Sequence, residues 1–256
     1  MGLSAIVITY KEEINIEQCL KSLAFADEIV VLDSYSTDRT LEIARKYTDK
    51  ISFREFTGFS DQKNAALALS TNEWILVIDA DEVVSEELAS EIITAIKNDK
   101  QDAYRIPRLT YFIGRKMRHC GWYPDYQLRL ARRSKAHFPD RLVHETLEIN
   151  GDIGTLKNDL IHFSYRDMND YSRKMMLYAR SAAEQKYIEG RRFNLGDLVL
   201  NPGLAFFKMY ILKQGFRDGL HGFILSVLTA CSTALRYSVL WSMQAQQQKQ
   251  EKSIER

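Results

Sequence analysis

The sequence predicts an α/β protein with a Rossmann-like, mostly parallel sheet, a mixed second half and carboxyl-terminal helices. Three observations predict this class. Strand-then-helix patterns repeat four times within residues 1–100, short strand-like pieces separated by Gly, Pro and basic residues occupy residues 101–197, and apolar helical patterns dominate residues 198–256. The same shifts of composition divide the chain into these three segments.

The first segment alternates strands and helices. Apolar, β-branched runs mark the strands, and apolar residues at helical spacing mark the helices. Four such units with right-handed crossovers produce a parallel sheet. The predicted strands are 3–8, 28–32, 51–56 and 74–78, and the helices that follow them are 14–23, 40–47, 60–69 and 85–96. The strand at 74–78 is apolar at every position, as expected for a central strand that is covered on both faces.

The rest of the chain predicts a mixed sheet and then helices. Short strands are expected at 103–107, 110–113, 127–131 and 146–149, and a helix at 168–189 ends at Gly190. Two apolar helices follow, one from residue 198 and one over 223–243, before a frayed tail at 244–256. Ser226, Thr229, Thr233 and Arg236 form one polar stripe on the second helix. Both packing against the main domain and in-plane contact with a membrane fit this pattern, whereas spanning a bilayer does not.

Composition excludes several classes of protein. The chain is 45% hydrophobic and 27% charged, which is typical of a globular protein, and its net charge of +1 gives no general attraction for nucleic acid. Cys19, Cys120 and Cys231 show no Cys-x-x-Cys pairing, so neither a disulfide framework nor a zinc knuckle is expected. The amino-terminal stretch has no cationic start of a signal peptide, and we expect a cytoplasmic protein.

Acidic residues follow the predicted central strand. Asp79 and Asp81 stand at its carboxyl end, where open α/β sheets bind ligands, and two such carboxylates can hold a hard divalent cation. A sugar-nucleotide diphosphate would complete the oxygen shell of that cation. Alternatively, these acids only precede a helix that Ser85 caps. Neither Gly-x-Gly-x-x-Gly nor Gly-x-x-x-x-Gly-Lys occurs, so dinucleotide oxidoreductases and P-loop enzymes lack support.

Four ordered motifs resemble a known family. Ile-Val-Ile-Thr-Tyr-Lys-Glu-Glu, Val-Leu-Asp-Ser-Tyr-Ser-Thr-Asp-Arg-Thr, Gln-Lys-Asn-Ala-Ala and Ile-Asp-Ala-Asp-Glu resemble the donor-binding half of family 2 glycosyltransferases, which have the GT-A fold. Gly-Trp-Tyr-Pro-Asp-Tyr-Gln-Leu-Arg-Leu, Val-His-Glu and Tyr-Ile-Leu-Lys-Gln-Gly-Phe-Arg-Asp-Gly are similar to the bacterial branch that adds glucose to the lipopolysaccharide inner core. The resemblance makes 1–100 the donor half, 101–197 the acceptor and catalytic half, and 198–256 a pair of amphipathic helices with membrane association.

The resemblance also implies site residues and a cofactor, Mg²⁺ or Mn²⁺. Lys11 departs from the family pattern, because Asn is common at this position. Asp33 and Asp38 would be turn residues, and Lys63 a solvated helix residue, under the alternative interpretation. The donor-binding and metal residues implied are Thr9, Tyr10 and Glu12 around the nucleoside, Asp33 on uracil or ribose, Lys63 near the phosphates, Asp81 on the metal, and Asp79 on the ribose or in the metal shell.

Family 2 members invert in a single displacement, which requires one positioned base. The resemblance offers Asp125 and Glu145, although Pro124 stands where the family usually has Glu before the base. His144 resembles the late histidine that completes metal coordination in some relatives. Arg129 is either a phosphate clamp or a surface ion-pair residue. His162 serves either the acceptor site or the core, and the sequence does not decide between them.

The predicted function is the transfer of a hexose, glucose from a UDP-sugar, to the lipopolysaccharide inner core or a similar lipid-linked glycan. The expected location is the inner face of the cytoplasmic membrane. One alternative is a non-catalytic sugar-nucleotide-binding or scaffolding protein of the same fold. Another is a nucleotidyltransferase, but the glycine-rich loop with Arg and Lys that such enzymes have after the first strand is missing.

Overall fold

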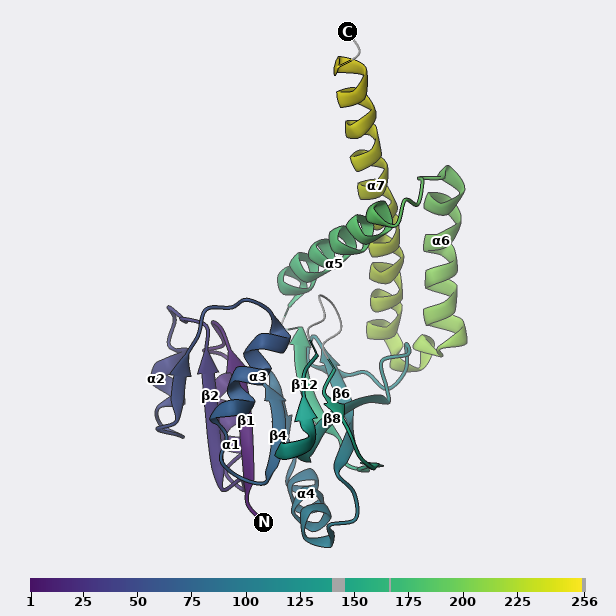
Figure 1. Cartoon of the computed structure of the whole chain (residues 1–256). Coiled ribbons are helices and arrows are strands. Elements are labelled where there is room, and N and C mark those ends of the chain that lie inside the picture. Colours follow the sequence, from purple (N-terminus) through teal and green to yellow (C-terminus); the bar gives the residue numbers. More distant parts are fainter. Residues whose placement is uncertain (140–145, 166, 255–256) are drawn as a thin grey trace. The chain divides into compact units, whose positions relative to one another are not determined.

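The computed structural model describes residues 1–139, 146–165 and 167–254 (Figure 1). The chain forms two compact units. The first contains Met1–Thr110 and Pro124–Ser164, and the second contains Tyr111–Tyr123 and Tyr165–Arg256. The second unit therefore combines the carboxyl-terminal helices with a short segment that leaves the sheet and returns to it.

The predicted α/β class is confirmed by a mixed sheet with the strand order β3-β2-β1-β4-β8-β6-β12-β5, in which β7 and β11 also pair with β6. β1 is parallel to β2 and β4, and β2 is parallel to β3, whereas β8 is antiparallel to β4 and β6. A separate pair joins β9 to β10. The strands are β1 Leu3–Thr9, β2 Glu28–Asp33, β3 Ile51–Phe53, β4 Trp74–Asp79, β5 Glu82–Val84, β6 Ala103–Phe112, β7 Arg115–Lys116, β8 Asp125–Arg132, β9 Ala136–His137, β10 Glu148–Ile149, β11 Ile153–Thr155 and β12 Leu160–Tyr165.

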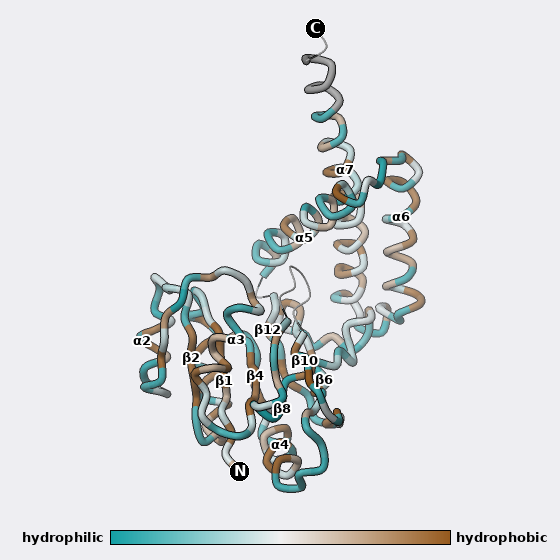
Figure 2. Tube along the Cα trace, viewed as in Figure 1, coloured by the Kyte–Doolittle hydropathy of each residue, from teal (hydrophilic) through white to brown (hydrophobic). Residues whose placement is uncertain are grey.

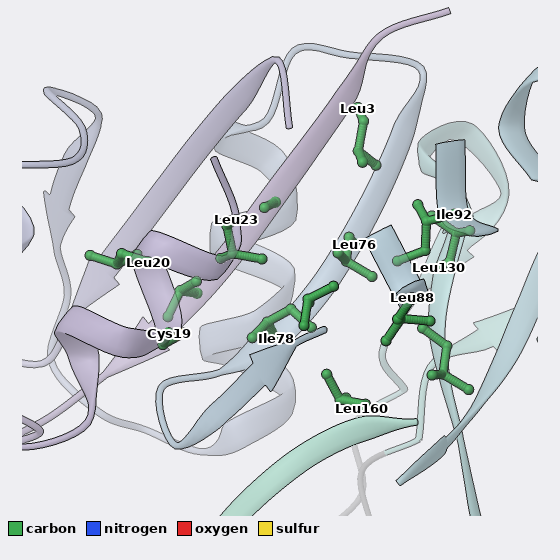
Figure 3. Close-up of a cluster of buried hydrophobic side chains, with 14 of the residues drawn as sticks. Leu3, Cys19, Leu20, Leu23, Leu76, Ile78, Leu88, Ile92, Leu130 and Leu160 are labelled. Carbon is green, nitrogen blue, oxygen red and sulfur yellow. The ribbon is translucent and has the colours of Figure 1, made fainter. Parts of the chain in front are cut away.

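The α-helices in the described part of the first unit are α1 Ile16–Ser22, α2 Thr40–Ala44, α3 Phe59–Leu69 and α4 Glu86–Asn98. One buried cluster joins α1, α2 and α4 to one face of the sheet (Figure 3), and a second joins α3 to the other face. Trp74 to Ile78 are all buried, which confirms a central strand covered on both faces. Ser85 caps α4, since its side chain accepts a hydrogen bond from the N–H of Leu88 at 3.2 Å.

The mixed half differs from the prediction in three ways. The strands expected at 103–107 and 110–113 are one strand, β6, because Pro107 keeps its pairing with Tyr126 and an extended strand tolerates the φ angle of proline. The strand expected at 146–149 is only β10, Glu148–Ile149. β5 and β12 were not predicted, and they pair antiparallel to each other. A strand as short as β5, Glu82–Val84, depends on a partner strand to complete its hydrogen bonds.

The second unit contains α5 Met168–Ile188, α6 Leu195–Phe207 and α7 Gly219–Ile254, and both α5 and α6 pack along α7. α6 continues into a wide helical turn at Lys208–Leu212, and a tight turn at Gly215–Asp218 leads into α7. The tail that we expected to be frayed from residue 244 is instead helical to Ile254.

Two glycines allow the close turn between α6 and α7. A Cβ on Gly222 would lie 1.9 Å from the carbonyl oxygen of Gly215, and a Cβ on Gly215 would lie 2.9 Å from that of Met209. No real side chain tolerates such distances. These positions therefore require glycine if α7 is to start where it does.

The three hydroxyls of the polar stripe on α7 make hydrogen bonds to the backbone of their own helix. The hydroxyls of Ser226, Thr229 and Thr233 each donate to the carbonyl four residues earlier, at 2.7 to 2.9 Å. Ser226 and Thr233 are buried. These three hydroxyls therefore need no solvent, because hydroxyls bonded to the helix backbone are satisfied inside the unit. The buried Nε of Arg236, by contrast, has no hydrogen-bond partner among the described residues.

Candidate functional site

The polar loops predicted from the sequence lie at one edge of the sheet. β2, β1 and β4 are parallel neighbours, and the register aligns Thr9 with Asp33 and Ile8 with Asp79. β8 runs antiparallel to β4, so its start at Asp125 lies at the same edge. The loops after β1, β2 and β4 therefore share one end of the sheet with the beginning of β8.

Hydrogen bonds join the loops after β1 and β2. The N–H of Ser34 donates to the carbonyl of Thr9 at 3.0 Å, and the N–H of Lys11 donates to the hydroxyl of Ser36 at 2.8 Å. Lys11 and Tyr35 have left-handed backbone conformations, with φ of 54° and 61°. Strained residues of this kind gather at functional sites, where surrounding contacts hold them in place.

The predicted nucleoside residues in these loops differ in exposure. Tyr10 is exposed, Glu12 is partly buried, and Asp33 is fully buried. Ser36 donates to both carboxylate oxygens of Asp33, through its N–H at 2.7 Å and its hydroxyl at 2.5 Å. The buried hydroxyl of Thr9 has no hydrogen-bond partner among the described residues. A bound polar ligand is one way to satisfy such a group.

Asp38 holds the second loop to the first. Its carboxylate accepts from the N–H of Thr40 at 3.1 Å, from the Thr40 hydroxyl at 2.6 Å, and from the N–H of Glu13 at 3.3 Å. Burial raises the pKa of Asp38, but these hydrogen bonds together lower it by more. The pKa of Asp38 therefore lies below its ordinary value. The carboxylate of Asp38 therefore already accepts the hydrogen bonds that hold this turn.

Asp79 lies between two cations. The Nζ of Lys63 is 3.3 Å from one carboxylate oxygen, and the guanidinium of Arg129 is 2.5 Å from the other. Burial raises the pKa of Asp79, but the charges of Arg129 and Lys63 lower it far more and keep it well below its usual range. Lys63 and Arg129 are both about 5% exposed, so neither is a solvated surface residue.

Glu82 completes this arrangement and was not predicted. It is fully buried, accepts a hydrogen bond from Arg129 at 2.6 Å and lies 3.4 Å from Arg108. Its other oxygen accepts from the N–H of Asp79 at 3.0 Å. Burial lowers the pKa of Arg129, but Asp79 and Glu82 raise it by more, so the guanidinium stays charged. Buried charges of this kind persist only when they are paired.

A β-bulge positions Arg129. The register pairs Leu130 with Tyr104 and Leu128 with Arg105, which leaves Arg129 as an extra residue on β8. A bulge bends its strand and redirects a side chain, and bulges are frequent beside active sites. The side chain that contacts Asp79 and Glu82 is therefore that of the bulged residue, Arg129.

Asp125 is also held by its neighbours. One carboxylate oxygen accepts from the guanidinium of Arg108 at 2.6 and 2.9 Å, and the other accepts from the side-chain amide of Gln127 at 2.7 Å. Its side chain remains 37% exposed, so a substrate hydroxyl can approach it. Lys63, Asp79, Arg129, Glu82, Arg108 and Asp125 thus form one ion-pair chain of alternating charge.

Asp81 has a different kind of partner. In the part of the chain that the structure describes, no lysine or arginine forms an ion pair with Asp81, and its carboxylate lies 3.3 Å from the Nε2 of His162. The Nδ1 of His162 is 3.2 Å from the hydroxyl of Thr110. His162 therefore belongs to this edge of the sheet, a question that the sequence left open.

Asp81 and His162 fit a divalent cation. Carboxylate oxygen and neutral imidazole nitrogen are both common ligands, with bonds of about 2.0–2.2 Å to zinc, so atoms 3.3 Å apart can reach one ion. Thr110 fixes the imidazole ring, as hydrogen bonds behind a ligand usually do. Across residues 1–139, 146–165 and 167–254 no group of three or more His, Cys, Asp or Glu side chains is placed to hold a metal ion. Substrate phosphates or water would supply the other ligands.

Two predicted residues, His144 and Glu145, lie outside the described residues. The prediction missed Glu82, which belongs to the acidic run after β4. The sequence does not show that Glu82 is buried, and its burial is what distinguishes it from an ordinary surface acid. Arg108 had no motif at all. Its role becomes visible only through the pairing of β6 with β8, which aligns Arg108 with Asp125.

Comparison with curated proteins gives a full-length relative. The chain is 30% identical over 260 residues to the lipopolysaccharide core biosynthesis glycosyltransferase LpsC of Rhizobium meliloti, covering 96% of this chain and 94% of LpsC. It is 28% identical to an uncharacterized glycosyltransferase of Rickettsia bellii, over 95% of this chain and 87% of that protein.

Solved structures support the same fold. The structure of TarS 1–349 from S. aureus in complex with UDP-GlcNAc matches with a TM-score of 0.52 at 18% identity, over 96% of this chain and 92% of that one. The mannosyltransferase PcManGT from Pyrobaculum calidifontis, in complex with GDP-Man and Mn²⁺, matches with a TM-score of 0.54 at 15% identity, over 94% and 87%. The family model for glycosyl transferase family 2 matches residues 4–148. The chain therefore belongs to glycosyltransferase family 2 and has the GT-A fold.

Proposed function

We propose that this glycosyltransferase moves a hexose, glucose from a UDP-sugar, to the lipopolysaccharide inner core or a similar lipid-linked glycan, with inversion and with Mg²⁺ or Mn²⁺. The observation that supports this most is the pairing of Asp81 with His162 beside the ion-paired Asp79, at the carboxyl ends of the strands. LpsC, whose name refers to lipopolysaccharide core biosynthesis, supports the acceptor class.

In this proposal Asp81 and His162 hold the cation, and His144 is a third candidate ligand. Asp79 is not a direct ligand, because Lys63 and Arg129 already engage both of its oxygens. Asp79 is instead assigned to the ribose. When bound, the cation neutralises the charge that builds up on the leaving diphosphate.

The donor lies against the first two loops. Thr9, Tyr10 and Glu12 surround the nucleoside, and Asp33 contacts the uracil or ribose from the second loop. The partnerless hydroxyl of Thr9 supports this placement. Lys63 and Arg129 lie near the diphosphate in this proposal, and at the end of β4 their charges balance those of Asp79 and Glu82.

Asp125 is the favoured base, and Glu145 remains the other candidate. The acceptor hydroxyl attacks the anomeric carbon while the nucleoside diphosphate leaves, and Asp125 accepts the hydroxyl proton. Arg108 and Gln127 hold the carboxylate of Asp125 in one orientation. A fixed base is advantageous, because inversion needs the hydroxyl on the face opposite the leaving group.

We assign residues 1–100 to donor binding and 101–197 to the acceptor and to catalysis. Residues 198–256 attach the protein to the inner face of the cytoplasmic membrane, where a lipid-linked acceptor presents its sugars. Attachment raises the local concentration of the acceptor. A non-catalytic sugar-nucleotide-binding role is the alternative, although the intact Asp79, Asp81 and Asp125 count against it.

The test is incubation of the purified protein with nucleotide sugars, Mn²⁺ or Mg²⁺, and truncated lipopolysaccharide cores, followed by mass spectrometry of the glycans. We expect the mass of one hexose to be added from a UDP-sugar to an inner-core acceptor. Donor binding without transfer or hydrolysis under any of these conditions would favour the non-catalytic alternative.

A further inference from the structure

The outer side of α6 is apolar and has no protein cover. None of the residues from Leu195 to Phe207 is buried, although most of them are hydrophobic, as the tube in Figure 2 shows along α6. Two stretches, Leu195–Leu212 and Gly215–Gln247, are long and apolar enough to cross a membrane by length and composition. The first has no buried residue, so α6 is the less covered of the two.

Four exposed apolar residues of α6 and of the wide turn that follows it form one stripe. Leu200, Leu204, Phe207 and Ile211 recur at helical spacing, and their exposed fractions are 65%, 62%, 51% and 43%. The other side of the hairpin is covered, because Phe206 and its neighbours stack on α7. We call the four exposed residues the α6 stripe. A contiguous apolar surface of this kind marks an interaction site.

Cations gather at the end of the stripe where α6 turns toward α7. All six are exposed, and two segments far apart in the sequence supply them. We call this set the basic rim, and its members are Arg115, Lys116, Arg118, Lys208, Lys213 and Arg217.

Asp218 brings the two segments of the rim together. Its buried carboxylate accepts from the N–H groups of Arg118 and His119, at 3.4 and 2.9 Å, and contacts the Nδ1 of His119 at 2.8 Å. The N–H of Cys120 donates to the carbonyl of Lys213 at 3.0 Å. These bonds therefore hold the backbone of the two segments that carry the rim side by side.

Backbone strain supports the same conclusion. Ile113, Cys120 and Gln214 all have left-handed conformations, with φ of 47°, 59° and 54°. Residues other than glycine adopt this conformation at a cost, and such strain persists where the surrounding structure holds it for function. Here the contacts of Asp218 and Cys120 fix both segments beside each other.

We propose that the α6 stripe and the basic rim bind an anionic phospholipid surface, with α6 lying in the plane of the membrane. This deepens the proposed function, on which it rests, by naming the lipid chemistry and the residues that meet it. Apolar side chains enter the acyl boundary while Lys and Arg beside them meet headgroup phosphates. The six cations fit a negative surface and would repel an identical rim on a second copy of this chain.

The first test is vesicle flotation of the full-length protein. We expect binding to vesicles that contain phosphatidylglycerol, weak binding to pure phosphatidylcholine vesicles, and weaker binding to the anionic vesicles at high salt. The variant Arg115→Gln/Lys116→Gln/Lys208→Gln should bind the anionic vesicles about a hundredfold less tightly, since each cation near such a surface contributes about fivefold. The control Lys46→Gln/Lys97→Gln/Lys100→Gln loses the same charge from exposed sites in the first unit and should bind like the wild type.

A second pair of variants tests the stripe. Leu200→Gln/Leu204→Gln should abolish flotation even at low salt while the fold is kept, because both side chains are exposed and glutamine favours helix. Leu177→Gln/Ile188→Gln changes two exposed apolar residues of α5 and should leave flotation unchanged. Equal melting temperatures of the variants would show that lost flotation is not lost folding.

Four outcomes would overturn the inference: no flotation of the wild type on anionic vesicles, equal binding by the rim variant and its control, resistance to alkaline extraction as expected for a spanning hairpin, or a stable dimer that ignores vesicles. Its failure is distinguishable from failure of the proposed function. A protein that floats but transfers no sugar keeps this inference. One that glycosylates a soluble truncated core but does not float loses this inference and the membrane attachment of residues 198–256, and keeps the proposed sugar transfer.

Discussion

In the first unit several charged side chains are buried in ion pairs, whereas in the second unit large apolar side chains remain at the surface. The ion-pair chain from Lys63 to Asp125 is held inside the first unit, although burying charge is costly. The α6 stripe exposes hydrophobic surface that a helix normally covers. Each unit departs from the usual distribution of residues, and each departure marks a place where a partner is expected. Changes to the two units should therefore have separable consequences.

The largest expected effect is on turnover through the first unit. Asp125→Asn should lower the rate of sugar transfer about a hundredfold to ten-thousandfold, the usual contribution of a general base, while donor binding is kept. Single-turnover kinetics measures this under conditions where chemistry limits the rate. Asp49→Asn, at an exposed position away from the ion-pair chain, is the matched control. Near-native turnover of Asp125→Asn would leave Glu145 as the base.

The next effect concerns the acid stability of the first unit. Burial raises the pKa of Glu28, but hydrogen bonds from Lys50, Ser4 and Thr71 lower it from 4.5 to about 2. Because the folded-state pKa is the lower one, this contribution is present above pH 4.5 and is lost as the pH falls toward 2. It amounts to about 3 kcal/mol of unfolding free energy.

Glu28→Gln tests this directly. The wild type should lose about 3 kcal/mol more than the variant between pH 5 and pH 2 in denaturant titrations. Identical pH dependence in the two proteins would mean that the Glu28 contacts do not stabilise the fold in solution. Sugar transfer at neutral pH serves as the control for a correctly folded site.

The smallest effect should be confined to the second unit. Gly222→Ala forces a methyl group against the carbonyl of Gly215 and should destabilise this unit by about 1–3 kcal/mol. Gly203→Ala is the matched control, since nothing lies within 4 Å of the added Cβ and alanine favours helix. Thermal unfolding measures both variants. Nucleotide binding by the first unit should be unchanged in Gly222→Ala. If the free energy of nucleotide binding falls by as much as the free energy of unfolding, the two units do not behave separately.

Residues that follow strands were predictable, because strand ends and motifs are local features of a sequence. Asp79 and Asp81 stand where the periodicity placed them, and the neighbouring parallel strands align Asp33 with Thr9. The partners were not predictable. Arg108 reaches Asp125 only through the β6–β8 register, and His162 reaches Asp81 only because β12 runs beside β5. Such non-local pairing leaves no periodic signal in one sequence.

The second unit shows a different limit. The apolar helices were predicted from composition, but Arg115 and Lys116 carried no motif that linked them to residues a hundred positions later. Asp218 makes that link by binding the N–H groups of Arg118 and His119. Likewise, the tail after residue 243 is rich in Gln and charge, which predicted fraying, yet it continues the helix of α7.

The most direct test of the central claim is the dependence of sugar transfer on a divalent cation and on Asp81. Transfer from a UDP-sugar is measured by mass spectrometry with added Mn²⁺ or Mg²⁺ and with excess chelator, for the wild type, Asp81→Asn and the control Asp49→Asn. We expect the wild type and the control to stop in chelator and to recover with metal. With added metal, Asp81→Asn should be slower than the wild type by about a hundredfold or more, because it lacks a ligand for the ion that stabilises the leaving group. Full turnover of the wild type in excess chelator would contradict the account.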